Sequence, residues 1–169
     1  MLFRSLHVLG FAVALVWAQL AWSQTGDQVG EKEGHELEAA VEFVQETGVN
    51  GNLRVIAFQV TQITQTMAIL AAEHGLAVVP VLRKNLNIAA AKRQAEWDRN
   101  LARAYLKFLT TEELSSLQKD GRNSPYFQKF AGHQNDIGDE MKSNSENIVG
   151  EVATEALVLR VEEMGLGER

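Results

Sequence analysis

The densest group of residues able to do chemistry is His133, Asp136, Asp139 and Glu140. If this segment is helical, three of the four side chains lie near one face, because residues three or four positions apart are neighbours on a helix. An imidazole nitrogen with carboxylate oxygens can ligate a divalent metal and support metal-dependent hydrolysis. Two nearby glycines weaken helix formation, however, and one histidine near several acids is common by chance. We therefore predict no metal site and no cofactor, and keep a metal-dependent hydrolase as the less favoured alternative.

The other residue types used in catalysis form no pattern. The chain has no cysteine, so it offers no thiol nucleophile, no thiolate metal ligand and no disulfide. No Gly-x-Ser-x-Gly elbow, Walker loop, dinucleotide fingerprint or His-Glu-x-x-His helix occurs. The histidines are scattered along the chain, at His7, His35, His74 and His133. Nothing in this distribution indicates an enzyme.

The first 23 residues have the composition of an export signal. Arg4 and His7 precede an apolar run from Val8 to Ala18, and Ala21-Trp22-Ser23 places small residues where a signal peptidase needs them. A membrane anchor needs about 20 uninterrupted apolar residues. Because Gln19 interrupts the run, we expect cleavage after Ser23, no stable membrane anchor afterwards, and a periplasmic or secreted bacterial protein.

The net charge argues against nucleic acid as a partner. Loss of Arg4 with the signal peptide would change the formal charge of the chain from −6 to −7. Residues 27–46 hold seven acids and one base, whereas residues 83–107 hold seven bases and two acids. Two interpretations of this uneven charge are open. The two segments face each other or water, or the basic segment forms a docking face.

A capping signal fixes the helices in the second half of the chain. Thr110 and Glu113 have the spacing of a capping box, which predicts a helix ending near Gly121. Ser124 followed by Pro125 predicts that another short helix starts there, because proline is tolerated in a first turn. Three aromatic residues follow directly.

Apolar periodicity predicts the remaining elements. We expect helices from Glu36 to Thr47, from Leu53 to Gly75 as the central core helix, from Val81 to Phe108, and from Ile137 to Leu159. Residues 76–79 are an interhelical connection. Glu96 and Asp98 precede Arg99 and Arg103, and such charges on a helix are usually exposed, so we assign them no function. The fold class is all-α: a single bundle of about five to six helices over residues 36–165, after a flexible acidic tail at 24–35.

The segment from Trp97 to Lys129 resembles an exported bacterial family, domain of unknown function 2059. Its pattern is a helix with a tyrosine, a Thr/Ser-x-Glu-Glu-Leu helix start and a Phe-Tyr-x-Ser-Pro-x-Gly-x-Lys segment. The matching residues here are Tyr105, Phe108, Thr110, Glu112, Glu113, Leu114, Leu117, Ser124, Pro125 and Lys129. The chain departs from the pattern at Asp120–Asn123 and at Phe127. The resemblance implies an all-helical periplasmic domain and supplies no catalytic residues.

We therefore expect a non-enzymatic module that contacts a protein or peptide. The expected surface joins three basic and three aromatic residues: Arg99, Arg103, Lys107, Tyr126, Phe127 and Phe130. Aromatic residues at helical spacing more often fill a core, and only an exposed cluster would form a binding surface. The alternative of the same class is a holdase chaperone, because Leu109–Glu113 is faintly similar to a signature of small periplasmic helical chaperones.

Overall fold

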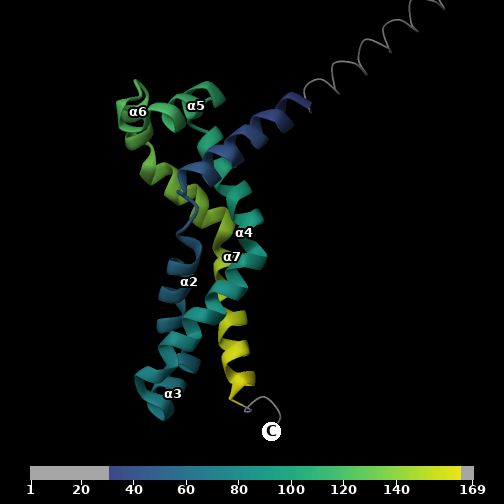
Figure 1. The fold of residues 1–169 in the computed structure, drawn as a ribbon, viewed down its shortest axis with the longest axis vertical. Coiled ribbons are helices and arrows are strands. Elements are labelled where there is room, and N and C mark those ends of the chain that lie inside the picture. Colours follow the sequence, from purple (N-terminus) through teal and green to yellow (C-terminus); the bar gives the residue numbers. More distant parts are fainter. Residues whose placement is uncertain (1–30, 165–169) are drawn as a thin grey trace, which may run out of the picture.

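The computed structural model describes residues 31–164, so the predicted signal peptide and residues 24–30 of the predicted tail lie outside it. All regular secondary structure among the described residues is helical, which confirms the predicted all-α bundle. The helices form an elongated body with a smaller helical head, residues 111–132, at one end (Figure 1).

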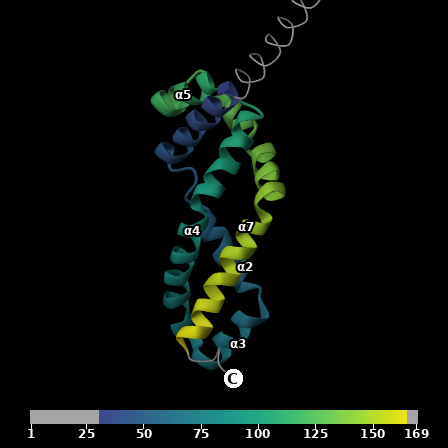
Figure 2. The same cartoon turned by 90° about the vertical axis from the view of Figure 1, so that its right-hand side faces the viewer.

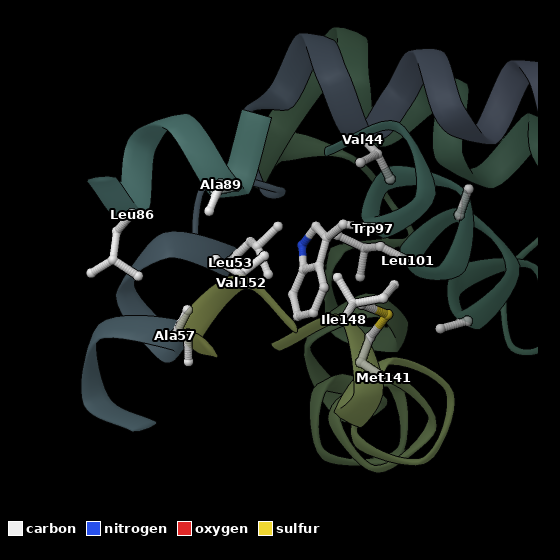
Figure 3. Close-up of a cluster of buried hydrophobic side chains, with 14 of the residues drawn as sticks. Val44, Leu53, Ala57, Leu86, Ala89, Trp97, Leu101, Met141, Ile148 and Val152 are labelled. Carbon is white, nitrogen blue, oxygen red and sulfur yellow. The ribbon is translucent and has the colours of Figure 1, made fainter. Parts of the chain in front are cut away.

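Two long antiparallel helices, α4 (Val78–Leu106) and α7 (Gln134–Glu163), form the axis of the body. They lie side by side in both views (Figures 1 and 2). The predicted apolar periodicity holds on both, because their buried side chains include Leu82, Leu86, Ala90, Trp97, Leu101, Ala104, Ile137, Met141, Ile148, Val152 and Ala156. Figure 3 shows the ring of Trp97 among buried aliphatic side chains of α2 (Leu53–Gln62), α4 and α7. This three-helix contact is the core of the body.

The predicted helix from Leu53 to Gly75 is in fact two helices, α2 (Leu53–Gln62) and α3 (Gln65–His74). Thr64 adopts an extended conformation between them, and its side-chain oxygen accepts a hydrogen bond from the Met67 amide at 3.2 Å. Threonine is a favoured N-cap because its hydroxyl satisfies an amide that the first turn leaves unpaired. The cap therefore starts a new helix inside an uninterrupted apolar pattern.

The prediction that this segment is the central core helix is wrong. Ile63 is 86% exposed, and Val55 and Ile69 are also exposed. Leu53, Ala57, Met67 and Leu70 are the apolar residues that α2 and α3 bury. α2 therefore packs against α4 and α7 and α3 packs against α4, each mainly through one narrow face.

Two further boundaries differ from the prediction. The connection before Pro80 is shorter than expected, because a 3-10 turn, η1 (Gly75–Ala77), leads straight into α4 and Pro80 falls in its first turn. The predicted flexible tail is wrong over residues 31–35, because a first helix already runs over residues 31–47. Lys32 and Glu36 lie 3.6 Å apart one turn along this helix, which is the spacing of a helix-stabilising pair.

The head is built on the predicted capping box, which the structure confirms. At the start of α5 (Thr111–Asp120), the Thr110 hydroxyl accepts from the Glu113 amide and the Glu113 carboxylate accepts from the Thr110 amide. Hydrogen bonds from Lys129 and then from the Thr110 amide lower the pKa of Glu113. Glu113 thus joins α5 to the next helix, α6 (Phe127–Gly132).

The start of α6 lies later than the Ser124-Pro125 signal predicts. A 3-10 turn, η2 (Gly121–Asn123), precedes Ser124, and α6 begins only at Phe127. The buried Ser124 hydroxyl accepts from the Tyr126 amide at 3.2 Å and lies 2.9 Å from the Ser116 hydroxyl. Ser124 therefore fixes the turn between α5 and α6.

A buried carboxylate, Asp98 on α4, connects the head side of the fold to the body. Asp98 is 3% exposed and accepts hydrogen bonds from three amide side chains: Gln45 at 3.1 Å, Asn50 at 2.8 Å and Gln94 at 2.7 Å. Our expectation that this charge is exposed is wrong, and its partners are neutral donors. Because an unpaired buried charge is costly, these hydrogen bonds hold the helix over residues 31–47 and the turn after it against α4.

Replacing Asp98 with asparagine tests this arrangement. An asparagine side chain presents its own NH2 group to the surrounding donors, so Asp98→Asn should lower the free energy of unfolding by about 2 kcal/mol. Glu96→Gln, at an exposed position on the same helix, is the matched control and should change it by less than about 0.5 kcal/mol. Urea unfolding followed by circular dichroism measures both. Equal stability of the two variants would contradict the proposed role of Asp98.

Candidate functional site

The structure separates the residues of the predicted interaction surface. Arg99 and Arg103 of α4 and Lys107, which directly follows this helix, are exposed and lie at four-residue spacing on one face. Lys107 forms an ion pair with Glu140 of α7, and Arg103 donates to the Asn100 side chain at 3.3 Å. Each of these bases lies two positions after a buried residue, about 200° around the helix. The basic face therefore points away from the buried side of α4.

The three predicted aromatic residues differ in their surroundings. Phe130 is half-buried and stacks on Tyr105 of α4 with the ring centroids 5.8 Å apart, and Phe43 meets both rings edge-on. Phe127 is also half-buried and lies 6.4 Å from Phe130. Tyr126 is 37% exposed. Phe130 thus packs between the head and the body, whereas Tyr126 faces solvent.

The group of residues considered for metal binding does not converge. His133 Nδ1 lies 2.9 Å from Asp136, and the imidazole stacks on Phe108. Glu140 instead contacts Lys107 and Asn144, and the hydrogen bond from Lys107 lowers the pKa of Glu140. Among residues 31–164 no three His, Asp or Glu side chains come close enough together to hold a metal ion. This part of the molecule therefore presents an isolated histidine–aspartate pair.

A groove of about 950 Å³ lies between α2, α4 and α7, which the sequence analysis did not find. Its walls are Val49, Asn52, Ile56 and Val60 on one side and residues of α7 on the other; Trp97, Leu101 and Tyr105 of α4 form the floor, and Phe130 contributes from α6. The α7 residues recur at helical spacing, and they are Gln134, Ile137, Gly138, Met141, Lys142, Ser145, Glu146, Val149 and Gly150. We call this feature the groove. It is mainly apolar with a few polar residues, as binding sites commonly are.

Two glycines of α7 line the groove. A Cβ atom added at Gly138 or at Gly150 would meet no atom within 4 Å. Glycine inside a helix costs up to about 1 kcal/mol relative to alanine, so each glycine weakens α7 and leaves open space in return. These two residues are the sequence signal that could have indicated the groove, because neither ends the helix.

The floor of the groove carries polar groups that the fold uses little. Tyr105 is 3% exposed, and burial alone raises its pKa to about 12. Its phenol therefore stays protonated and can donate a hydrogen bond at neutral pH. Ser145, on the α7 wall of the groove, is also buried, and its hydroxyl accepts a hydrogen bond from the Asn100 side chain at 3.1 Å. The hydroxyl groups of Tyr105 and Ser145 can therefore take part in hydrogen bonds, as the polar groups of a binding site do.

A second unusual surface lies at the opposite end of the molecule from the head. The segment of α3 and η1 from Gln65 to Ala77, which we call the tip, leaves Leu76 88% exposed beside the exposed Ile69. The helical stretch Gln65–Leu106 is long and apolar enough to cross a membrane by composition, and only 22% of its most apolar window is buried. The turn at η1 divides this stretch into two helices, so it does not form one continuous span. The tip is therefore an exposed apolar surface.

The aromatic contacts can be tested by truncation. Phe130→Ala removes a ring that packs on Phe43 and Tyr105, and it should lower the free energy of unfolding by about 2 kcal/mol. Tyr126→Ala removes an exposed ring only one helical turn away, and its effect should stay below about 0.5 kcal/mol. Chemical unfolding of the two variants measures the difference. A larger loss for Tyr126→Ala would show that we have assigned the two rings wrongly.

Comparison with known proteins yields no relative: no family model, no curated protein and no solved structure matches the chain. The resemblance to domain of unknown function 2059 therefore stays a prediction. A proposal for the function therefore rests on the fold and on the groove.

Proposed function

We propose that this chain is an exported, non-enzymatic binding module whose partner, a protein or peptide segment, docks in the groove. The observation that carries the proposal is the groove itself, an open and mainly apolar space of about 950 Å³ against the core. Exposed apolar surface of this kind is costly in water unless a partner covers it. The export signal predicted at residues 1–23 supports a periplasmic or secreted location for this binding.

Filling the groove should abolish binding without harming the fold. Gly138→Leu places a side chain in the open space of the groove and also favours the helix, so the variant should be at least as stable as the wild type. Gly132→Leu is the matched control, because Gly132 is helical, has equally open surroundings and lies outside the groove. The three immobilised proteins are incubated with periplasmic extract of the source cells, and bound proteins are quantified by mass spectrometry.

We expect proteins that bind the wild type and Gly132→Leu equally to be depleted about tenfold or more on Gly138→Leu. The contrast between two glycine variants separates loss of the groove from a general effect of adding leucine. The same set of bound proteins on all three would contradict the proposal that the groove is the docking site.

The exposed tip favours holdase activity as the second candidate function. Holdases bind unfolded chains through exposed apolar surface, and Leu76 and Ile63 are the two most exposed large apolar residues in the part of the chain that the structure describes. They flank α3 at its two ends, Leu76 within the tip and Ile63 two positions before it. This activity would use a different surface from the groove.

An aggregation assay distinguishes the two functions. If the tip and the adjacent Ile63 hold unfolded clients, the wild type and Gly138→Leu should both suppress light scattering of a thermally unfolded model enzyme, and Leu76→Asp combined with Ile63→Asp should reduce that suppression severalfold. Both substituted positions are exposed, so the fold should persist. Suppression that is absent in the wild type, or unchanged in the double variant, would remove this candidate.

A further inference from the structure

The two edges of α7 differ in how their charges are satisfied. Along the edge that faces α4, four acids form ion pairs with bases on α4 or directly after it: Glu140 with Lys107, Glu151 with Arg93, Glu155 with Lys92 and Glu163 with Lys84. The pairs follow the antiparallel course of the two helices. Each of these four acids on this edge of α7 therefore has a basic partner.

The charged residues on the edge of α7 that borders the groove are not paired in this way. Lys142 and Glu146 are exposed, lie one turn apart and line the groove. Neither forms an ion pair within residues 31–164, and they do not pair with each other. The groove therefore has apolar walls and, on its α7 rim, one base and one acid without partners. A partner that fills the groove meets both charges.

The shape of the groove favours a helix as that partner. Its α7 wall runs from Gln134 to Gly150, which is about 24 Å at the helical rise per residue. The opposite wall is α2 and the floor is α4, so the groove is the space beside three helices where a fourth would pack. Gly138 and Gly150 leave room for a neighbouring backbone to approach α7.

Hydrogen bonding argues against an extended peptide. An extended segment would bring unpaired amide and carbonyl groups against apolar walls, and the elements that line the groove are helices with no free strand edge to pair with it. A helix satisfies its own backbone groups and needs only an apolar face. An acyl chain would fill the volume but would leave Lys142 and Glu146 without opposite charges.

We propose that the groove binds an amphipathic α-helix of a partner protein, about four turns long, which places an acid opposite Lys142 and a base opposite Glu146. This inference rests on the proposed function and adds the conformation and charge order of the partner. Two rim pairs of this kind contribute more to selectivity than to affinity. The charge order of the partner should therefore matter more than its exact apolar residues.

Two labelled designed peptides of about 16 residues test the proposal. They share one leucine-rich apolar face and one composition; one carries glutamate then lysine four positions later beside that face, and the other carries lysine then glutamate. Binding is measured by fluorescence anisotropy, and helix formation by circular dichroism of the unlabelled peptides. We expect the wild type to prefer one peptide by about fivefold and to raise its helicity.

The double variant Lys142→Glu, Glu146→Lys should reverse the preference. The matched control, Lys92→Glu with Glu155→Lys, exchanges a pair on the other edge of α7 and should leave it unchanged. Equal binding of the two peptides, a preference that survives the Lys142 and Glu146 exchange, or binding of neither peptide would each overturn the proposal. So would binding of a fluorescent fatty acid by a protein that ignores both peptides. The glycine variants test the proposed function separately, because Gly138→Leu can lose its bound proteins whatever the peptides do.

Discussion

The buried carboxylate of Asp98 is the constraint on which the arrangement of the fold depends. A charge in the interior must be compensated, and here three amide donors from three different segments do so. Satisfying this one group fixes the helix over residues 31–47, the turn containing Asn50 and the middle of α4 relative to one another. That turn also contains Val49 and Asn52, which line the groove. The polar interaction thus places one end of an apolar surface.

Much of the fold could be predicted from local signals. The apolar spacing on α4 and α7 and the capping box at Thr110 depend on neighbours within one or two turns, and the structure agrees with both. The break at Thr64 could not be separated from the surrounding apolar pattern, because a threonine in a helix and a threonine that caps one look alike in sequence. Burial of Asp98 was missed because its donors Gln45 and Asn50 lie about 50 positions away along the chain.

The candidate site was less predictable than the fold. The groove joins α2, α4, α6 and α7, whose residues are far apart in the chain, and no single segment carries its signature. Phe130 is the member of the predicted surface that also lines the groove. It could be predicted because an aromatic residue near a core can be recognised by its type. The basic residues Arg99, Arg103 and Lys107 were expected beside it, but helical geometry turns them to another face.

The interruption at Thr64 has a mechanical consequence. Because α2 ends at Gln62 and α3 starts afresh from its own cap, no backbone hydrogen-bond ladder of one continuous helix links the groove wall to the apolar tip. Fraying of α3 would stop at the cap and leave Ile56 and Val60 in place. The tip can therefore loosen without deforming the α2 wall of the groove, so each of the two surfaces can yield to a ligand separately.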